Sequence, residues 1–285
     1  MFFDRLSNGF ALAHCSWRVL MQDKKLIVFP ILSGIACLLV LASFVTPFLF
    51  NQQWLQPIFN GQDGFKMPWW GYVVLFAYYF CNYFVIVFFN SALISCALVR
   101  FNGGEPTLAD GIRVAMARLP QILAWALVSA TVGVLLKVIE NTHKTVGEIV
   151  SAILGTAWSI LTYFVVPVLV VEKVGPIEAV KRSMQILRKT WGEALVGNMG
   201  MDLFVFLLFL PVILVAIVGV VMLGVMLPVG VALLVLAAVG FGVVSAVGPA
   251  LHGIFLAAIY QYAAQGEVPD GFDKQVLRSA FARKR

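Results

Sequence analysis

The sequence alternates between long stretches without charge and shorter segments in which charged residues gather. Stretches that contain no Asp, Glu, Lys or Arg cover residues 26–62, 67–99, 119–136, 149–171 and 203–266. A helix needs about 20 apolar residues to cross the hydrocarbon core of a bilayer, so each of the first four stretches holds one span. The fifth is long enough for two, and we divide it at residues 224–230, where glycine and proline permit a tight reversal. The pattern predicts six transmembrane helices, near 27–50, 70–99, 120–138, 149–171, 200–223 and 230–262.

The segments before the first, third and fifth spans have a different, amphipathic pattern. Their apolar residues recur at steps of three and four, which places them on one face of a helix. These residues are Phe3, Leu6, Phe10, Ala13 and Trp17; Leu108, Ile112, Ala115 and Leu119; and Ile177, Val180, Met184, Leu187 and Trp191. Each amphipathic helix is expected either to lie in the headgroup layer or to pack on the cytoplasmic ends of the spans. Trp17 and Trp191 end identical patterns, so we expect them to occupy equivalent positions.

An amphipathic helix, a span, a turn and a second span together form a repeating unit. The unit occurs over about residues 1–104, 105–175 and 176–266, and each copy ends close to a glycine and a proline, which end one helix and open the next. Residues 267–285 add an amphipathic tail. We therefore predict a single integral domain, residues 1–285, of the all-α membrane class. Its six transmembrane helices form three hairpins, each preceded by a cytoplasmic amphipathic helix.

Composition and charge agree with this interpretation and orient the chain. Hydrophobic residues make up 61% and charged residues 12% of the sequence, against about half and a quarter in soluble domains. Of the 20 Lys and Arg residues, 17 lie in the leader, the two even-numbered connections and the tail, which places these segments and both termini in the cytoplasm. We expect the basic segments to attract anionic lipid headgroups. No aromatic and basic platform accompanies them, so we expect no nucleic-acid partner.

Two segments carry a resemblance to known proteins. The leader GFALAHCSWRVLMQDKKLIVFPILSGIA and the loop GPIEAVKRSMQILRKTWGEALVGN resemble those of uncharacterised bacterial six-span proteins of unknown function. They are also similar to the membrane domain that is fused to some glycerophosphodiester phosphodiesterases. The resemblance implies a six-span fold and a location in the bacterial inner membrane, but it implies no functional residue. These residues hold no hydrolase domain, so we do not expect phosphodiesterase activity.

Four polar residues inside the predicted spans are candidates for a functional site, because such groups are costly at membrane depth. Asp202 is either a carboxylate at a helix N-terminus or a ligand for a proton or cation in a cavity. His252 either bonds to a neighbouring helix as a neutral imidazole or, beside Gly248–Pro249, belongs to a ligand site on a loosened helix. Asn82 and Asn90, two turns apart, either bridge helices or line a solute path. In each case we favour the first, structural interpretation.

The sixth span also carries a ridge of small residues at every fourth position. The ridge consists of Ala238, Gly242, Ala246 and Ala250. Small residues at this spacing let a second helix approach closely. The partner helix belongs either to the same chain or to another copy in a homo-oligomer.

Catalytic and metal-binding motifs are absent from the sequence. It contains no P-loop, HExxH or GxSxG motif, its four cysteines form no CxxC pair, and its three histidines are scattered. We therefore predict no enzymatic activity, no cofactor and no metal site. The leading hypothesis is a bundle that organises or scaffolds the membrane, and the alternative is a small transporter or channel; an intramembrane enzyme ranks third. A hydrated cavity lined by the four polar residues would favour transport, and a dry bundle would favour the scaffold.

Overall fold

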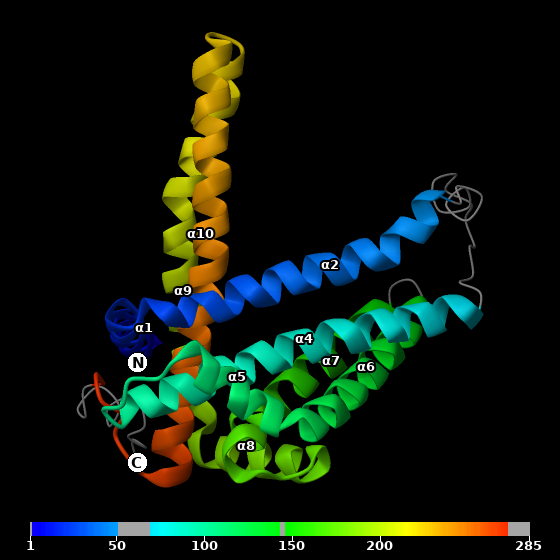
Figure 1. Cartoon of the computed structure of the whole chain (residues 1–285), viewed down its shortest axis with the longest axis vertical. Helices are drawn as coiled ribbons and strands as arrows, with labels where there is room; N and C mark the ends of the chain where they lie inside the picture. Colours follow the sequence, from blue (N-terminus) through cyan, green and yellow to red (C-terminus); the bar gives the residue numbers. More distant parts are fainter. Residues whose placement is uncertain (1, 51–68, 143–145, 273–285) are drawn as a thin grey trace. The chain divides into compact units, whose positions relative to one another are not determined.

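The computed structural model describes residues 2–50, 69–142 and 146–272, and these residues form helices and no strands (Figure 1). The all-α fold class is confirmed. The α-helices are α1 (Phe2–Gln22), α2 (Val28–Phe50), α4 (Trp69–Phe101), α5 (Leu108–Ala117), α6 (Leu119–Thr142), α7 (Val146–Leu161), α8 (Val165–Glu172), α9 (Pro176–Leu223) and α10 (Leu227–Tyr260). A short 3-10 helix, η1 (Lys24–Ile27), precedes α2, and a π-helical turn, η3 (Gln261–Gln265), ends α10.

Within the described residues, six helical segments are long and apolar enough to cross a membrane, in the order and near the positions that the sequence predicts. They are Lys24–Pro47, Trp69–Phe101, Leu119–Asn141, Val146–Glu172, Met199–Leu223 and Leu227–Gln265. The sixth begins a few residues earlier than expected because Pro228 sits in the first turn of α10, where a missing N–H costs nothing. The chain is a multi-pass membrane protein. Its grouping into three hairpins with cytoplasmic amphipathic helices remains a prediction.

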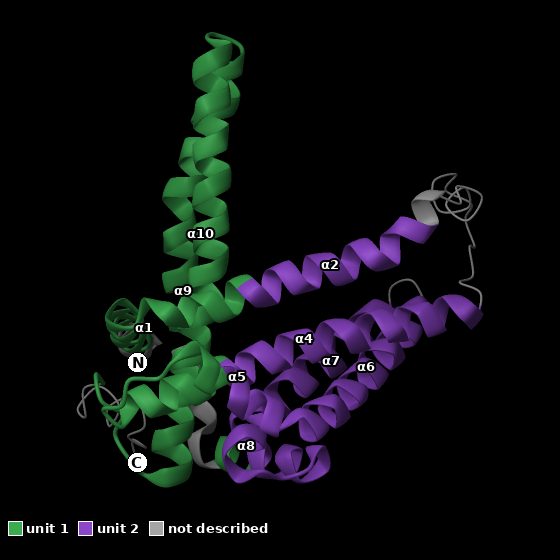
Figure 2. Cartoon of the chain, viewed as in Figure 1, with its two compact units in different colours: residues 1–31, 93–111, 185–285 green, residues 32–92, 112–184 purple. Residues whose placement is uncertain are grey.

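The chain forms two compact units (Figure 2). Unit 1 contains residues 1–31, 93–111 and 185–285, and unit 2 contains residues 32–92 and 112–184. The boundaries fall inside α2, α4, α5 and α9, so both units share long helices. The predicted repeat units follow the order of the chain, whereas this division follows contacts in space.

The core of unit 1 lies where α1, the end of α4 and the end of α10 meet. Fully buried side chains come from all three, including Leu20, Leu93 and Phe255. Two glycines permit the close approach of the helices. A Cβ on Gly253 of α10 would collide with the side chain of Leu93, and a Cβ on Gly200 of α9 would lie 2.6 Å from the Cα atom of Gly9. Of the predicted tail, residues 267–272 are described and form no helix, and residues 273–285 lie outside the described residues.

The membrane-spanning half of α9 packs along α10. A Cβ on Gly248 would lie 3.1 Å from Val205, and one on Gly240 would lie 3.1 Å from Val212. The rings of Phe209 and Phe241 are 5.4 Å apart. The remaining faces of this pair expose large apolar side chains, as lipid-facing helices do, including Leu210, Leu214, Val221, Leu236 and Val239.

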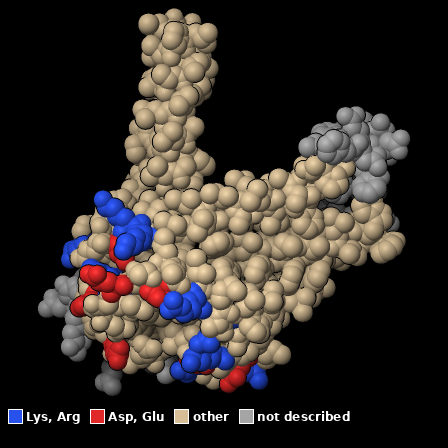
Figure 3. Space-filling view, viewed as in Figure 1, with Lys and Arg blue, Asp and Glu red and all other residues tan. Residues whose placement is uncertain are grey.

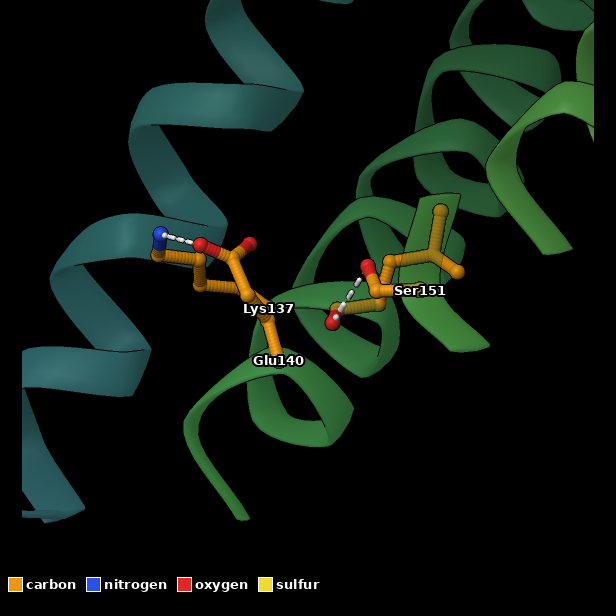
Figure 4. Close-up of polar contacts among 4 residues, drawn as sticks. Lys137, Glu140 and Ser151 are labelled. Atoms are coloured by element: carbon orange, nitrogen blue, oxygen red, sulfur yellow. Dashed lines mark hydrogen bonds and ion pairs between the residues drawn. The ribbon is translucent and has the colours of Figure 1, made fainter. Parts of the chain in front are cut away.

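Unit 2 is built mainly from α4, α6, α7 and α8. The indole rings of Trp125 and Trp158 stack at 5.7 Å with an interplanar angle of 13°, which joins α6 to α7. At the other end of this pair, the hydroxyl of Ser151 donates to the carbonyl of Leu136 at 3.1 Å (Figure 4). Lys137 forms an ion pair with Glu140, 2.7 Å apart, near the end of α6 (Figure 4).

Candidate functional site

Unit 1 brings two of the four candidate polar residues into contact. Asp202 projects from α9 and His252 from α10, and the imidazole Nε2 lies 3.2 Å from the carboxylate Oδ1. Both residues lie inside candidate membrane spans. The His252 side chain is 35% exposed and that of Asp202 is 57% exposed in the chain on its own. The two side chains are within ion-pair distance, and they form an ion pair when the imidazole is protonated.

The favoured interpretation of Asp202, as a carboxylate at a helix N-terminus, is wrong. The predicted amphipathic segment and the fifth span form one continuous helix, α9, of 48 residues, which begins at Pro176. Asp202 therefore lies in the interior of the helix, where the partial positive charge of the N-terminus is not available. Its carboxylate lies instead beside His252 on α10, with 3.2 Å between Oδ1 and Nε2.

The helix that carries His252 is not interrupted by its proline. Pro249 lies inside α10, which runs continuously from Leu227 to Tyr260. A proline inside a helix removes one backbone hydrogen bond, here to the carbonyl of Ser245, but the helix does not open at this point. The imidazole contacts Asp202 on the neighbouring helix, and the alternative interpretation, a helix loosened beside Gly248, is not seen.

Asn82 and Asn90 belong to the other unit and are half-buried on α4. The side-chain Nδ2 of Asn82 donates to the carbonyl of Tyr78, one turn earlier in the same helix, at 3.1 Å. This bond is local to α4, whereas we expected a bridge to a second helix. The structure therefore assembles Asp202 and His252 into a pair within unit 1, and Asn82 and Asn90 lie in unit 2.

The ridge on the sixth span is only partly used for packing within the chain. Ala246 and Ala250 are buried, but Ala238 and Gly242 are exposed, and a Cβ on Gly242 would meet no atom within 4 Å in the described part of the chain. The physical reason is helical geometry. Each step of four residues turns the ridge by about 40°, because the helix has 3.6 residues per turn. The face toward α9 instead carries Gly240 and Gly248.

Of the two candidate interfacial tryptophans, Trp17 has a described side chain and Trp191 does not. The ring of Trp17 on α1 is half-buried and contacts the edge of Phe204 on α9, with 6.2 Å between ring centroids. Trp191 lies on α9, but its side chain is outside the part of the structure that is described. The predicted equivalence of the two residues therefore stays a prediction.

A buried serine that we did not single out from the sequence closes a break in the fourth span. Helices α7 and α8 are separated at residues 162–164, because Pro167 lacks an N–H and its ring would clash with the carbonyl of Tyr163. Ser183, which is fully buried on α9, donates to the carbonyl of Leu161 at 2.7 Å and accepts from the N–H of Phe164 at 3.1 Å. The break therefore has protein partners for its freed backbone groups.

Only part of this arrangement has a signal in the sequence. Pro167 and Pro211 are both prolines inside apolar spans, but only Pro167 lies beside a break, because α9 continues through Pro211. Ser183 is one polar residue among several in a predicted amphipathic segment. A second contact holds the same helices, since the Nε atom of Arg182 bonds both carboxylate oxygens of Glu172, at 2.9 and 3.1 Å. Neither partnership follows from local spacing, because each joins residues in different helices.

The described residues contain no metal-binding cluster and no disulfide bond. Over residues 2–50, 69–142 and 146–272, no group of three or more His, Cys, Asp or Glu residues is placed to hold a metal ion. The cysteines are unpaired, and Cys15 and Cys96 are buried. Asp202 and His252 are thus the one ionisable pair that we take forward as a candidate site.

Comparison with known proteins identifies a family but no activity. The model of a family of unknown function (DUF6159) matches residues 70–271, which run from the second residue of α4 to the residue before Phe272. No curated protein and no solved structure matches this chain.

Proposed function

We propose that this chain, which belongs to the DUF6159 family of unknown function, is a non-enzymatic scaffold that organises the bacterial inner membrane. The observation that carries the proposal is the docking of α1. Its apolar face is buried, with Leu12 and Val19 at most 2% exposed, whereas His14 and Arg18 on the opposite face are exposed. The ring of Phe10 packs 5.2 Å from that of Phe204, at the start of the fifth span. Helix α1, which precedes the first span in the sequence, therefore packs against the start of the fifth span.

The orientation of the scaffold rests on the distribution of basic residues. Of 20 Lys and Arg residues, 17 lie in the segments that we assign to the cytoplasm, together with both termini. The exposed polar face of α1 then meets the cytoplasmic headgroup layer, where each basic residue contributes about 1 kcal/mol of attraction to anionic lipid. The exposed half of the small-residue ridge on α10, which consists of Ala238 and Gly242, is available to a second copy of the chain or to another protein.

Reconstitution into vesicles tests the scaffold. We expect the full-length protein to slow the lateral diffusion of a labelled anionic lipid, measured by fluorescence recovery after photobleaching. The variant Phe10→Ala, which weakens the docking of α1, should slow it less at equal protein density. As a matched control, Phe241→Ala truncates a phenylalanine on α10 away from α1 and should behave like the unmodified protein. Lipid diffusion that is the same with and without the protein contradicts the scaffold.

The Asp202–His252 pair supports a second candidate, a proton- or cation-coupled transporter. Ionisable residues within spans commonly form proton relays in transporters. A pH-sensitive dye inside vesicles, with a potassium diffusion potential as driving force, measures proton flux directly. If the chain is a transporter, flux should exceed that of protein-free vesicles and be lost in Asp202→Asn and His252→Gln, but not in Asp270→Asn, an exposed residue outside the pair. Flux at the level of protein-free vesicles rejects this candidate and leaves the scaffold.

A further inference from the structure

Unit 1 contains an open cavity of about 470 Å³ beside the start of the first span and the end of the second. One wall comes from the end of α1 and from η1, and the other from the last turn of α4 and the loop that follows. Its charged lining residues are Asp23, Lys24, Lys25, Arg100 and Glu105. The volume lies within the range of pockets that bind small ligands.

Both walls of the cavity are held by a well-bonded backbone. In the first, Leu26 is buried and donates from its N–H to the carbonyl of Asp23 at 3.2 Å, which fixes the 3-10 turn. In the second, the N–H of Gly104 donates to the carbonyl of Val99 at 3.0 Å, and Arg100 Nη1 donates to the carbonyl of Gly104 at 3.5 Å. A site whose backbone is already ordered loses little entropy when a ligand binds.

The charged side chains that line this cavity do not form ion pairs with one another within the described residues. Within the described residues, Lys24, Lys25 and Arg100 form no ion pair with Asp23, Glu105 or any other carboxylate. Three cations and two carboxylates therefore face one small volume. Lysine and arginine side chains are the usual ligands of phosphate, and a carboxylate accepts hydrogen bonds from an ammonium group. The lining matches a ligand that carries both groups.

The depth of the cavity indicates where such a ligand comes from. The first candidate span begins at Lys24, and the second ends one residue after Arg100. The cavity therefore lies where two spans leave the hydrocarbon core, at the level of lipid headgroups. On the face shown in Figure 3, the charged side chains of unit 1 gather around α1 and the end of α4, and none is visible toward the tip of the α9–α10 pair.

We propose that this cavity binds the headgroup of a phospholipid that carries a phosphate and a primary ammonium. Lys24, Lys25 and Arg100 bind the phosphate, and Asp23 and Glu105 bind the ammonium. This site differs from the diffuse attraction to anionic lipid that basic segments provide, because its carboxylates disfavour a purely anionic headgroup. The proposal does not depend on whether the chain is a scaffold or a transporter.

Native mass spectrometry of the full-length protein in neutral detergent tests the site. The probes are phosphatidylethanolamine, phosphatidylcholine and phosphatidylglycerol with matched acyl chains. We expect retention of phosphatidylethanolamine to exceed that of the other two by about fivefold, the equivalent of one good charge contact. Phosphatidylcholine lacks ammonium N–H donors, and phosphatidylglycerol lacks the ammonium. Arg100→Gln and Glu105→Gln should each remove this preference, and Arg100→Lys, which keeps the charge, should retain part of it.

Matched controls and further outcomes separate the proposal from its competitors. Arg188→Gln and Glu178→Gln neutralise exposed residues outside the cavity and should leave the preference unchanged. Equal retention of all three lipids overturns the proposal, as does a preference for phosphatidylglycerol that depends on Arg100 but not on Glu105. Displacement of the bound lipid by an equal concentration of soluble phosphoethanolamine overturns the assignment to a lipid, because a membrane lipid also gains affinity from its acyl chains.

Discussion

At the scale of the residue, the hydroxyl of Ser183 provides hydrogen bonds to backbone groups at the break in the fourth span. Ser183 satisfies the carbonyl of Leu161 and the N–H of Phe164, and both bonds lie in a buried region of unit 2. We expect Ser183→Ala to lower the free energy of unfolding by about 1–3 kcal/mol, because it leaves buried backbone groups unpaired. Thermal unfolding in detergent measures the change. Ser159→Ala removes a hydroxyl that bonds only within its own helix and should cost less than about 0.5 kcal/mol; equal effects contradict this account.

At the scale of the element, α1 and α9 cross where two backbones nearly touch. A Cβ at Gly200 would lie 2.6 Å from the Cα atom of Gly9, so Gly200→Ala should force the helices apart and destabilise the protein by about 1–3 kcal/mol. Gly242→Ala makes the same change on α10, where the described chain offers no atom within 4 Å. That variant should be neutral, or more stable by the helix preference of alanine, about 0.5–1 kcal/mol. Thermal unfolding curves of the two variants measure the difference in stability. Equal melting temperatures would show that α1 and α9 are not closely packed at Gly200.

At the scale of the whole molecule, the distribution of basic residues predicts the topology. Reporter fusions after Gln53 and Asn141 should be periplasmic, and fusions after Gly104, Gly192 and Arg285 should be cytoplasmic, because 17 of 20 Lys and Arg residues lie on the second side. Alkaline phosphatase and green fluorescent protein fusions report the two sides in opposite ways. A periplasmic C-terminus would contradict the count of six spans.

The sequence alone determines the class of the protein and the number and position of its candidate spans. These follow from local properties, since the bilayer demands about 20 consecutive apolar residues wherever a helix crosses it. The pattern around Trp17 predicts the helix α1 but not its buried face, since Phe10 and Trp17 are half-buried and the buried side chains include Leu12, Ser16 and Val19. Proline by itself does not determine where a span breaks, because the fourth span is broken beside Pro167, whereas α9 and α10 continue through Pro211 and Pro249.

Only the tertiary structure decided which of these elements meet. The continuity of α9 through Asp202 and the pairing of Asp202 with His252 depend on contacts between helices rather than on spacing along one of them. The same holds for Ser183, whose partners lie about 20 residues earlier in the chain. The face of α10 that packs is set by Gly240 and Gly248 because α9 lies there, although Gly242 has an equally small side chain. Periodicity shows that a helix has a packing face, but the partner helix determines which small residues that face uses.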